Sequence, residues 1–596
     1  MTGGSRGAEP PGGRPIVAVI PFGARGTTPR AGAWARQLAA RLVERFSRSE
    51  AVDVRPVFLV AMPEATSDAG YLVFGSSPEA GLAAEYGRSL GATYALTGTY
   101  REDGGTRRLE ATLVDVASGT VRATRSIAIA AGTLATAEPA LGRWLARAVG
   151  AADGADAPAA ANETAYAALL EGMDEEVTAT LVRQSDPAGA EEAIGRALER
   201  YLAAVSADTE CAAAEERVLV LSAESLERDD DVRQVRALED LTVLKPRSWR
   251  AHFILGKLRA EGGHVNEAIV AFEHAHAVRP LPDAEIVRLA ELYANAGASG
   301  PAFAHLRRIR ATSEAYATAQ ELTAIIALQR GDLETGRAAF ERAVAAGAAG
   351  WELHASYAAA LHARGDSAEA IPRYEAAVVA RGPVIVRLNL ARAAYETGDR
   401  ERAGRELDTL LKIEKSGEIA GQARRLRFGL HHPDLERALE TAGKGAVEGD
   451  ATRFAEAKSA FDAALGVEPD LWEAHFGLGL LARHRGDAQA ALTSYARVLE
   501  LWPEHPDALH ELGVALLMAD DVEQAVGALE RAAALRPSEA AYLADAGFAQ
   551  LRAGDFAAAR ERLEYARTLD ADDPVTRAYL EELDRVEGER STSSPS

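Results

Sequence analysis

The chain has 596 residues, of which 47% are hydrophobic and only 6% aromatic, and its formal net charge is −23 at pH 7. One hydrophobic core does not support this length, so we expect more than one folding unit. The single cysteine, Cys211, excludes an intramolecular disulfide framework and any multi-cysteine metal site, and it predicts a reducing, cytoplasmic location.

The charge is unevenly distributed along the chain. Residues 1–150 hold 17 Arg, no Lys and 13 acidic residues, a net charge of +4, which leaves −27 for the rest. Binding to a phosphate backbone needs clustered Lys and Arg, so we expect no nucleic-acid partner. The whole chain holds 60 Arg against 6 Lys, which is compatible with a bacterial source of high GC content.

The first 15 residues, MTGGSRGAEPPGGRP, lack the apolar core that a signal peptide needs. They are predicted to form a disordered leader. The longest apolar run nearby, at 127–135, is far shorter than the roughly 18 residues of a membrane span. We therefore expect neither an export signal nor a membrane-spanning segment.

Residues 16 to about 150 alternate between strand and helix patterns. Turn signals at Gly104-Gly105 and Ser118-Gly119 predict two hairpins. The resulting order βαβαβββα implies one mixed sheet with helices packed on it. The predicted elements are a strand at 16–22, a helix within 31–49, a strand at 52–60, a helix at 78–90 capped by Ser77, three β-rich runs between 92 and 130, and a helix at 133–149.

Three motifs in this domain are VAVIPF (17–22), LGATYALTGTY (90–100) and LVDVASG (113–119). In this order and spacing they resemble the amino-terminal domain of TolB and its cytoplasmic relatives. The resemblance implies a mixed α/β domain of the kind that, in bacterial regulators, often precedes tetratricopeptide arrays. In some of those regulators it follows a cyclase, a kinase or a winged-helix module.

No catalytic constellation is visible in the first domain. Histidine does not occur before residue 252, and no Gly-x-Gly-x-x-Gly motif follows a strand. Asp115 precedes a turn, whose amides its side chain can bond. Pro21 and Gly98 are expected at strand ends. No paired group gives a reason for a shifted pKa in the obvious carboxylates, which are Glu79, Glu85, Asp103 and Asp115.

After the small, unpatterned segment 153–165, the chain is periodic. WEAHFGLGLLARHRGDAQAALTSYARVLELWPEH, from residue 472, and the segment PDALHELGVALLMADDVEQAVGALERAAALRP agree at small, large and turn positions at an offset of about 34 residues, the tetratricopeptide period. The interval of 88 residues between Gly398 and Gly486 leaves room for a further repeat and about 20 extra residues. The turn positions are Gly263, Gly297, Gly331, Gly365, Gly398, Gly486, Asp520 and Gly554.

Each repeat is expected to be a helical hairpin. Small residues of the first helix, such as Gly256, Gly479, Gly513 and Gly547, would let the second helix approach closely. One hairpin cannot bury both of its faces, so neighbouring repeats must stabilise each other. We expect about ten repeats and a terminal helix.

The fold class predicted is mostly α, with a TolB-like mixed α/β domain followed by a right-handed α-solenoid of tetratricopeptide hairpins. The boundaries expected are a leader at 1–15, the α/β domain at 16–150, a linker at 151–165, a first array at 166–415 with a diverged start, an interruption at 416–437, a second array with a capping helix at 438–587, and a disordered tail at 588–596.

Outward-facing residues of the first helices would line the concave face of such an array. Aromatic side chains and methionine beside arginine are typical of a peptide-binding groove, although packing or solvation explains each residue equally well. The candidate partner-binding residues are Arg250, Phe253, Lys257, Asn389, Arg392, Phe476, Arg483, His484, His510, Met518, Phe548 and Arg552.

Other apparent motifs lack the context that their chemistry requires. His510-Glu511 has no second histidine four residues after the first, and the pairs His274/His276 and His431/His432 lack further ligands. The array is similar to chaperone-binding tetratricopeptide domains, but Ala355 and Ala359 replace residues of their carboxylate clamp. No metal, no cofactor and no chaperone-peptide recognition are predicted.

The preferred hypothesis is a non-enzymatic interaction scaffold or regulatory adaptor that holds a protein segment in the concave groove. Two alternatives stay open. The chain could be a regulatory subunit of a separately encoded kinase or cyclase, or a small-ligand sensor that uses the long loop at 61–77. The sequence names neither the partner nor the oligomeric state.

Overall fold

The computed structural model describes residues 14–25, 29–47, 49–57, 78–103, 105–151, 159–224, 232–449 and 451–593. The chain divides into two compact units, residues 1–305 and 306–596, and each is described by itself.

The first unit begins with a mixed sheet whose strands are ordered β3-β1-β4-β5-β6, with β2 beside β4. Strands β1 and β3 are parallel to each other, β1 is parallel to β4, and β4, β5 and β6 follow one another antiparallel. The amino-terminal mixed sheet expected from the sequence is thereby confirmed. The strands are β1 (Ile16–Val19), β2 (Gly23–Arg25), β3 (Asp53–Pro56), β4 (Tyr94–Asp103), β5 (Thr106–Asp115) and β6 (Thr120–Ile129).

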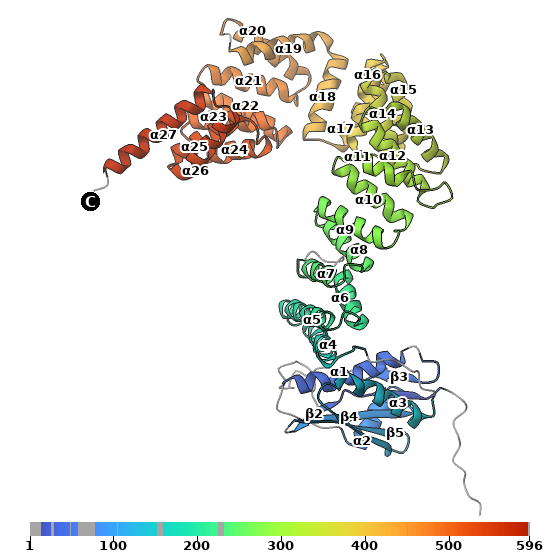
Figure 1. Cartoon of the computed structure of the whole chain (residues 1–596). Helices are drawn as coiled ribbons and strands as arrows, with labels where there is room; N and C mark the ends of the chain where they lie inside the picture. Colours follow the sequence, from blue (N-terminus) through green and yellow to red (C-terminus); the bar gives the residue numbers. More distant parts are fainter. Residues whose placement is uncertain are drawn as a thin grey trace, which may run out of the picture. The chain divides into compact units, whose positions relative to one another are not determined.

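Helices cover both faces of this sheet (Figure 1). Helices α1 (Pro29–Phe46) and α3 (Ala137–Val149), the latter preceded by a 3-10 turn at Leu134–Thr136, lie on one face, and α2 (Ala80–Ser89) lies on the other. Leu38 and Leu141 belong to the core on the α1/α3 side, whereas Ala83 and Val114 belong to the core on the α2 side. The alternation of side chains along the strands divides the apolar residues between these two layers.

Three glycines of the sheet region compare the sequence predictions with the structure. Gly105 and Gly119 have φ of 86° and 68° in the two hairpin turns, a conformation that favours glycine. Gly98 was expected at a strand end but lies in the middle of β4. A Cβ at Gly98 would lie 3.0 Å from Phe22 Cδ1 and 2.8 Å from the Glu110 carbonyl oxygen, so close packing explains this glycine.

The helix expected at 78–90 is shorter in the structure. It begins at Ala80, and its N-cap residue is Glu79, whose side chain makes no capping hydrogen bond. Ser77, the expected cap, and the loop 61–77 lie outside the described residues.

Helices follow the sheet to the end of the first unit. α4 packs against α1, and one continuous core of buried residues extends from the sheet through α4 to α9. The helices are α4 (Glu163–Val182), α5 (Pro187–Ala207), α6 (Ala212–Glu224), α7 (Val232–Leu244), α8 (Trp249–Glu261), α9 (Val265–Val278), α10 (Asp283–Asn295) and α11 (Ser299–Leu306), which crosses the division between the units.

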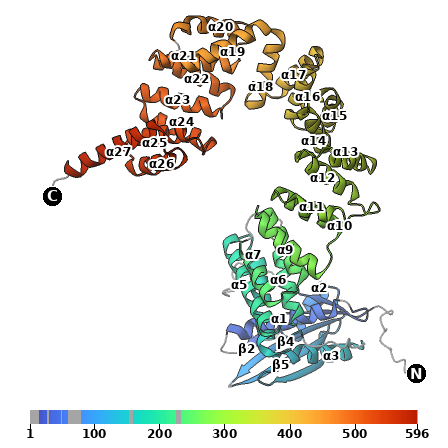
Figure 2. The ribbon, with the colours of Figure 1, turned by 45° about the horizontal axis from the view of Figure 1, so that its top comes forward.

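The second unit is helical throughout its described residues, apart from turns (Figure 2). Its helices are α12 (Tyr316–Gln329), α13 (Leu333–Ala345), α14 (Trp351–Ala363), α15 (Ser367–Val379), α16 (Val384–Glu396), α17 (Arg400–Ile413), α18 (Glu418–His431), α19 (Pro433–Glu448), α20 (Phe454–Val467), α21 (Trp472–His484), α22 (Ala488–Leu501), α23 (Pro506–Met518), α24 (Val522–Leu535), α25 (Ala540–Ala553), α26 (Phe556–Leu569) and α27 (Pro574–Ser593).

Two segments of the second unit differ from simple repetition. The interruption expected at 416–437 contains α18 and the beginning of α19, so the extra residues are helical. Helix α27 continues to Ser593, past the end expected at residue 587. Ion pairs of Arg585 with Glu582 and Glu589, spaced three and four residues along the helix, support this continuation.

The turn of each hairpin repeats one backbone conformation. The eight turn positions read from the sequence all have positive φ, and Gly449, with φ of 70°, marks the repeat within the long interval. Asp520 is the non-glycine member of the series, with φ of 61°. The mostly helical repeat architecture expected from the sequence is therefore confirmed.

Glycines of the first helices allow the second helices to approach closely. A Cβ at Gly479 would lie 2.5 Å from Tyr495 Cε1, and a Cβ at Gly513 would lie 2.4 Å from Leu529 Cγ. The same relation joins Gly256 to Phe272 and Gly547 to Leu563, at 3.0 and 2.7 Å. A small residue facing a large one is thus repeated from hairpin to hairpin in both units.

Candidate functional site

The candidate partner-binding residues lie on the first helices of their hairpins, and we call the surface that they form within each unit its first-helix face. They come from α8 (Arg250, Phe253, Lys257), α16 (Asn389, Arg392), α21 (Phe476, Arg483, His484), α23 (His510, Met518) and α25 (Phe548, Arg552).

In the first unit, two candidates of α8, Phe253 and Lys257, contact each other, and Arg250 and Lys257 each pair with a neighbouring first helix. The Arg250 guanidinium pairs with Glu216 of α6, and its Nη2 donates to Glu216 Oε1 at 3.1 Å. The Lys257 ammonium lies 5.0 Å from the ring centroid of Phe253 and 3.7 Å from Glu285 of α10. These contacts connect three consecutive first helices.

Helix α16 carries two candidates that contact each other. Arg392 Nη1 donates to Asn389 Oδ1 at 3.4 Å, and Arg392 Nη2 donates to Gln422 Oε1 of α18 at 2.6 Å. On α14, His362 Nε2 lies 2.8 Å from Glu396 Oε2 of α16. The first-helix face is therefore connected from α14 to α18.

Helices α21 and α23 form an aromatic and charged part of the face. Phe476 stacks on His505, with ring centroids 5.8 Å apart, and also contacts Tyr495 at 5.7 Å. Arg483 Nε lies 2.7 Å from Glu511 Oε2. His484 lies against Phe454, with centroids 5.9 Å apart.

Of the four candidates on α23 and α25, three contact neighbouring helices or turns in the same way. His510 Nε2 lies 2.7 Å from Asp545 Oδ2, and its ring stacks on Tyr542 with centroids 4.4 Å apart. Phe548 stacks on Tyr579 of α27 at 4.3 Å. Arg552 Nη2 donates to Asp520 at 2.8 Å, whereas Met518 is 43% exposed.

The first-helix face is thus a ladder of side-chain contacts between successive hairpins. Because its arginine and lysine side chains are already paired with neighbouring polar groups, they are held in place before any partner arrives. The sequence pattern identified these residues but not their partners. The partners lie about one repeat away, and a local pattern does not show which side chains of two repeats meet. The structure does not bring them together into one compact site.

The His510–Asp545 pair has the geometry of a base and its orienting carboxylate, but not the surroundings of a catalytic site. The other oxygen of Asp545, Oδ1, accepts a hydrogen bond from the Tyr579 hydroxyl at 3.0 Å. Within the described part of the chain, no serine, threonine or cysteine hydroxyl or thiol is recorded as a hydrogen-bond partner of His510. The pair joins α23 to α25 and α27.

A buried charged cluster, which sequence reading missed, joins the sheet domain to the first hairpin. Glu138 is 2% exposed and accepts from the Tyr166 hydroxyl at 2.6 Å and from Arg41 Nε at 3.4 Å. Burial alone would lower the pKa of Arg41, but the carboxylates of Glu138 and Glu44 raise it. Burial, and secondly Glu138, raise the pKa of Tyr166 well above its usual range.

Further ion pairs surround this cluster. Arg36 of α1 binds both oxygens of Asp174 in α4, at 2.9 and 2.6 Å, and Arg217 of α6 pairs with both Glu44 and Glu176. Carboxylate and guanidinium groups alternate, so the charges neutralise one another. Such a cluster fixes one domain on another rather than supplying a reactive group.

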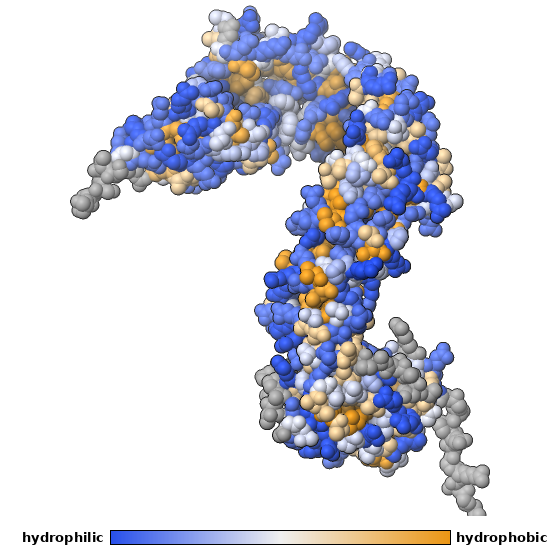
Figure 3. Space-filling model, in the orientation of Figure 1, coloured by the Kyte–Doolittle hydropathy of each residue, from blue (hydrophilic) through white to orange (hydrophobic). Residues whose placement is uncertain are grey.

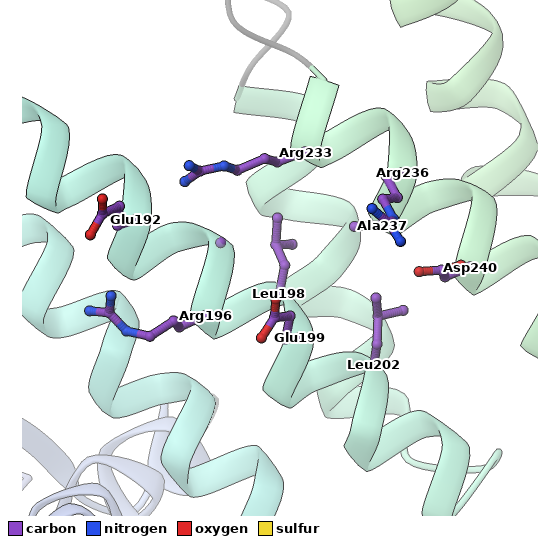
Figure 4. Close-up of a pocket in the computed structure, with 10 residues that line it drawn as sticks. Glu192, Arg196, Leu198, Glu199, Leu202, Arg233, Arg236, Ala237 and Asp240 are labelled. Atoms are coloured by element: carbon purple, nitrogen blue, oxygen red, sulfur yellow. The ribbon is translucent and has the colours of Figure 1, made fainter.

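A groove of about 620 Å³ lies between α5 and α7 (Figure 4). Leu198, Leu202 and Ala237 supply its apolar lining. Figure 4 shows Arg196 and Arg233 extending toward the same end of the groove as Glu192. Arg233 lies over Gly195, where a Cβ would be 3.3 Å from its Nη1. Acidic and basic groups are mixed around the groove, so it has no clear preference for a charged ligand.

Neither a metal site nor a membrane-crossing element is found in the described residues. No group of three or more His, Cys, Asp or Glu side chains there could hold a metal ion. No described helix is both long enough and apolar enough to cross a bilayer. Cys211 is 1% exposed, and burial raises the pKa of its thiol.

Family models described as "Tetratricopeptide repeat" match residues 321–384, 442–506 and 482–546. These segments are tetratricopeptide repeats. Proteins with such repeats generally mediate protein–protein interactions and are typically not enzymes. No curated protein matches the chain.

Several solved structures are similar in part. YrrB, titled a TPR protein with an unusual peptide-binding site, is 19% identical, with 33% of this chain and 92% of that chain covered and a TM-score of 0.21. A tetratricopeptide repeat protein from Parabacteroides merdae is 16% identical, with 45% and 98% covered and a TM-score of 0.21. The P58(IPK) TPR domain is 16% identical, with 64% and 99% covered and a TM-score of 0.22. We take no functional conclusion from likenesses this low.

Proposed function

We propose that the protein is a non-enzymatic scaffold or regulatory adaptor that binds a segment of a partner protein along its first-helix face. The observation that carries this proposal is the ladder of paired side chains between successive first helices, such as Arg483 with Glu511 and His510 with Asp545. A face fixed in this way loses little conformational entropy on binding. Stacked aromatic side chains and the exposed Met518 supply apolar contact area.

We also propose that the sheet domain is TolB-like and that the protein works in a bacterial cytoplasm. The motifs VAVIPF and LVDVASG fall on β1 and on the end of β5, and LGATYALTGTY covers β4, so all three belong to neighbouring strands. The single buried thiol and the arginine bias support the setting.

The alternatives remain predictions. The small-ligand sensor depends on the loop 61–77, which lies outside the described residues. A regulatory subunit of a separate kinase or cyclase would use the same first-helix face. It would therefore differ from the adaptor only in the identity of the bound partner.

Site-specific photo-crosslinking in the full-length chain tests the adaptor. A photoreactive phenylalanine analogue replaces Met518, which is 43% exposed at the end of the first helix α23. The matched control places the same analogue at Tyr565, which is 49% exposed on the second helix α26. We expect a host protein to be crosslinked from position 518 and not from position 565, and mass spectrometry identifies it.

Competition makes the result specific. The captured protein is purified and labelled, and its crosslinking to position 518 is measured. Adding an excess of the same protein without label should reduce this crosslinking in a saturable manner. Equal capture from both positions would show that the first-helix face is not selective and would overturn the proposal.

A further inference from the structure

Strand β6 forms an open edge of the sheet. It ends the strand order β3-β1-β4-β5-β6, and in the described part of the chain only β5 pairs with it. β6 has 10 residues, and most are exposed, whereas the opposite edge strand β3 has 4. An edge strand presents unpaired backbone N–H and C=O groups that another strand can join.

This edge lacks two of the features that usually block strand addition, short length and proline, while its charged side chains restrict which strands can join it. β6 contains no proline. Its register with β5 is irregular only near Leu113/Val114, opposite the beginning of β6. From Ala123 to Ile129 the pairing with β5 is regular, which leaves a straight segment of about seven residues, or about 24 Å at 3.4 Å per residue.

The side chains along the edge are cationic. Between Asp115 and Glu138 the sequence contains Arg122 and Arg125 and no acidic residue. Arg122 donates to the Ala148 carbonyl at 3.3 Å and lies over the Tyr94 ring. Arg125 is exposed, and within the described residues no partner is recorded for it.

The cations flank both faces of the edge. Arg125 lies opposite Ala111, which belongs to the core on the α1/α3 face, so Arg125 is on that face. Arg108 of β5 lies opposite Ala128 and alternates with Leu109, which places it on the α2 face. An added strand beside β6 would therefore have Arg125 next to it on the α1/α3 face, while Arg108 lies one strand further in on the other face, which it shares with Glu110.

We propose that residues 123–129 of β6 bind an extended acidic segment of a partner protein by strand addition. Backbone hydrogen bonds to β6 would supply the pairing, and Arg108 and Arg125 would select for acidic side chains. A second copy of β6 is disfavoured, because it would bring Arg122 and Arg125 of two strands together. This site lies on the sheet domain and does not depend on the first-helix face.

Fluorescence anisotropy with a defined probe tests the proposal on the full-length protein. The probe is a fluorescein-labelled peptide of four Glu-Val units, and the matched control is the same peptide with Lys in place of Glu. We expect saturable binding of the Glu-Val peptide, weaker binding at higher salt, and no saturable binding of the Lys-Val peptide.

Backbone methylation separates strand pairing from attraction between charges. A strand has two hydrogen-bonding edges, so N-methylation of the valines alone leaves one edge able to pair with β6. N-methylation of every residue blocks both edges and leaves the charge unchanged. We expect the first peptide to bind and the second to lose binding, and equal binding of both would overturn strand addition.

Protein variants locate the site. The double variant Arg108→Glu/Arg125→Glu should bind the Glu-Val peptide at least about tenfold more weakly, whereas Arg247→Glu, an exposed residue outside the sheet, should leave binding unchanged. Circular dichroism checks that the variants are folded. Unchanged binding of the Glu-Val peptide by the folded double variant would overturn the proposal. It would also be overturned if analytical ultracentrifugation showed dimers of the wild type that are lost in the variant Ser126→Pro, because β6 would then pair with a second copy of the chain.

Discussion

Gly479 shows how one residue sets the distance between two helices. A methyl group there would lie 2.5 Å from Tyr495 Cε1, on a tyrosine that is fully buried. Tyr495 cannot withdraw into solvent without leaving the space between hairpins, so the helices would have to separate. The same pairing at Gly513 and Leu529 shows that the spacing belongs to the repeat rather than to one site.

We predict that Gly479→Ala destabilises the protein by about 1–3 kcal/mol, because the added methyl overpacks the α21–α22 contact. The matched control is Gly527→Ala within α24, where nothing lies within 4 Å of the new Cβ. That change should stabilise the helix by about 0.5–1 kcal/mol. Urea-induced unfolding followed by circular dichroism measures both, and a stabilising Gly479→Ala would contradict this packing.

Glu473 gives a second residue-scale prediction. Its side chain is 23% exposed, and burial raises its pKa to about 7, although Arg425 lies 4.0 Å away. In the unfolded chain the carboxyl ionises near pH 4.5. Between these values the folded state holds more protons than the unfolded state, so the contribution of Glu473 to stability falls as pH rises from about 4.5 to 7.

Glu473→Gln should therefore raise the free energy of unfolding relative to wild type at pH 8, by at most about 3 kcal/mol, and should change it little at pH 4.5. Glu504→Gln, an exposed carboxylate nearby in sequence, is the control and should show no such pH dependence. A constant difference between wild type and Glu473→Gln across this range would show that Glu473 is not held neutral in the fold.

Helix α18 is the element that sets this array apart from a uniform series of hairpins. Ala423 and Leu430 bury one side of it against the α16–α17 core, while Phe428 belongs to the core of α19–α21. Gly421 faces Trp472, and the Gly417 amide donates to the Leu501 carbonyl at 2.8 Å. One helix therefore contributes to two hydrophobic cores of the second unit.

Several buried polar atoms near α18 have no hydrogen-bond partner among the described residues. They include Arg424 Nη1, Trp472 Nε1 and His505 Nε2. His505 is 3% exposed, and burial lowers its pKa to about 4. Polar groups left unpaired in this way destabilise a contact, so the junction is less stable than its apolar area suggests.

The variant Gly421→Leu tests this junction. A side chain there would meet Trp472 Cδ1 at 3.1 Å and Trp502 Cε3 at 3.7 Å, so we expect it to move α18 away from α21 and α22. Tryptophan emission should shift to longer wavelength, and the melting temperature should fall. Gly443→Leu on α19, where nothing lies within 4 Å of the new Cβ, should change neither; equal effects from both would argue against the close contact.

At the scale of the molecule, the sheet domain and the first hairpins share one core. That core runs from Val17 of β1 through Tyr166 of α4 to Ala271 of α9. The buried Glu138 cluster adds ion pairs across the same contact. We therefore predict that the sheet and helices α4 to α9 unfold together.

Glu138→Gln should destabilise the first unit by about 3–5 kcal/mol, because it removes the charge of a buried carboxylate that lies beside the guanidinium groups of Arg41 and Arg45. Hydrogen exchange should increase in both α3 and α4. The control Glu110→Gln removes a half-exposed partner of Arg101 and should cost about 1 kcal/mol or less. Increased exchange confined to α3 would contradict a shared core.

Local pattern was enough to predict the hairpins but not their connections. The turn positions and the small residues of the first helices recur in sequence because each hairpin solves the same packing problem, so both could be read from the 34-residue period. The partners of Arg250, Arg483 and His510 lie in the next or previous hairpin. Which acidic residue meets each of them depends on how hairpins stack, which no local pattern contains.

The sequence by itself determined the helical repeats, the mixed sheet and the turn conformations, because each follows from local periodicity and from the φ that glycine permits. Only the tertiary structure decided that Glu138 is buried among arginines, that α18 joins two cores, and that β6 is an open cationic edge. Each of these depends on residues distant in sequence, and so does the surface: on the face drawn in Figure 3, hydrophobic residues gather in patches among mostly hydrophilic ones because folding brings them together.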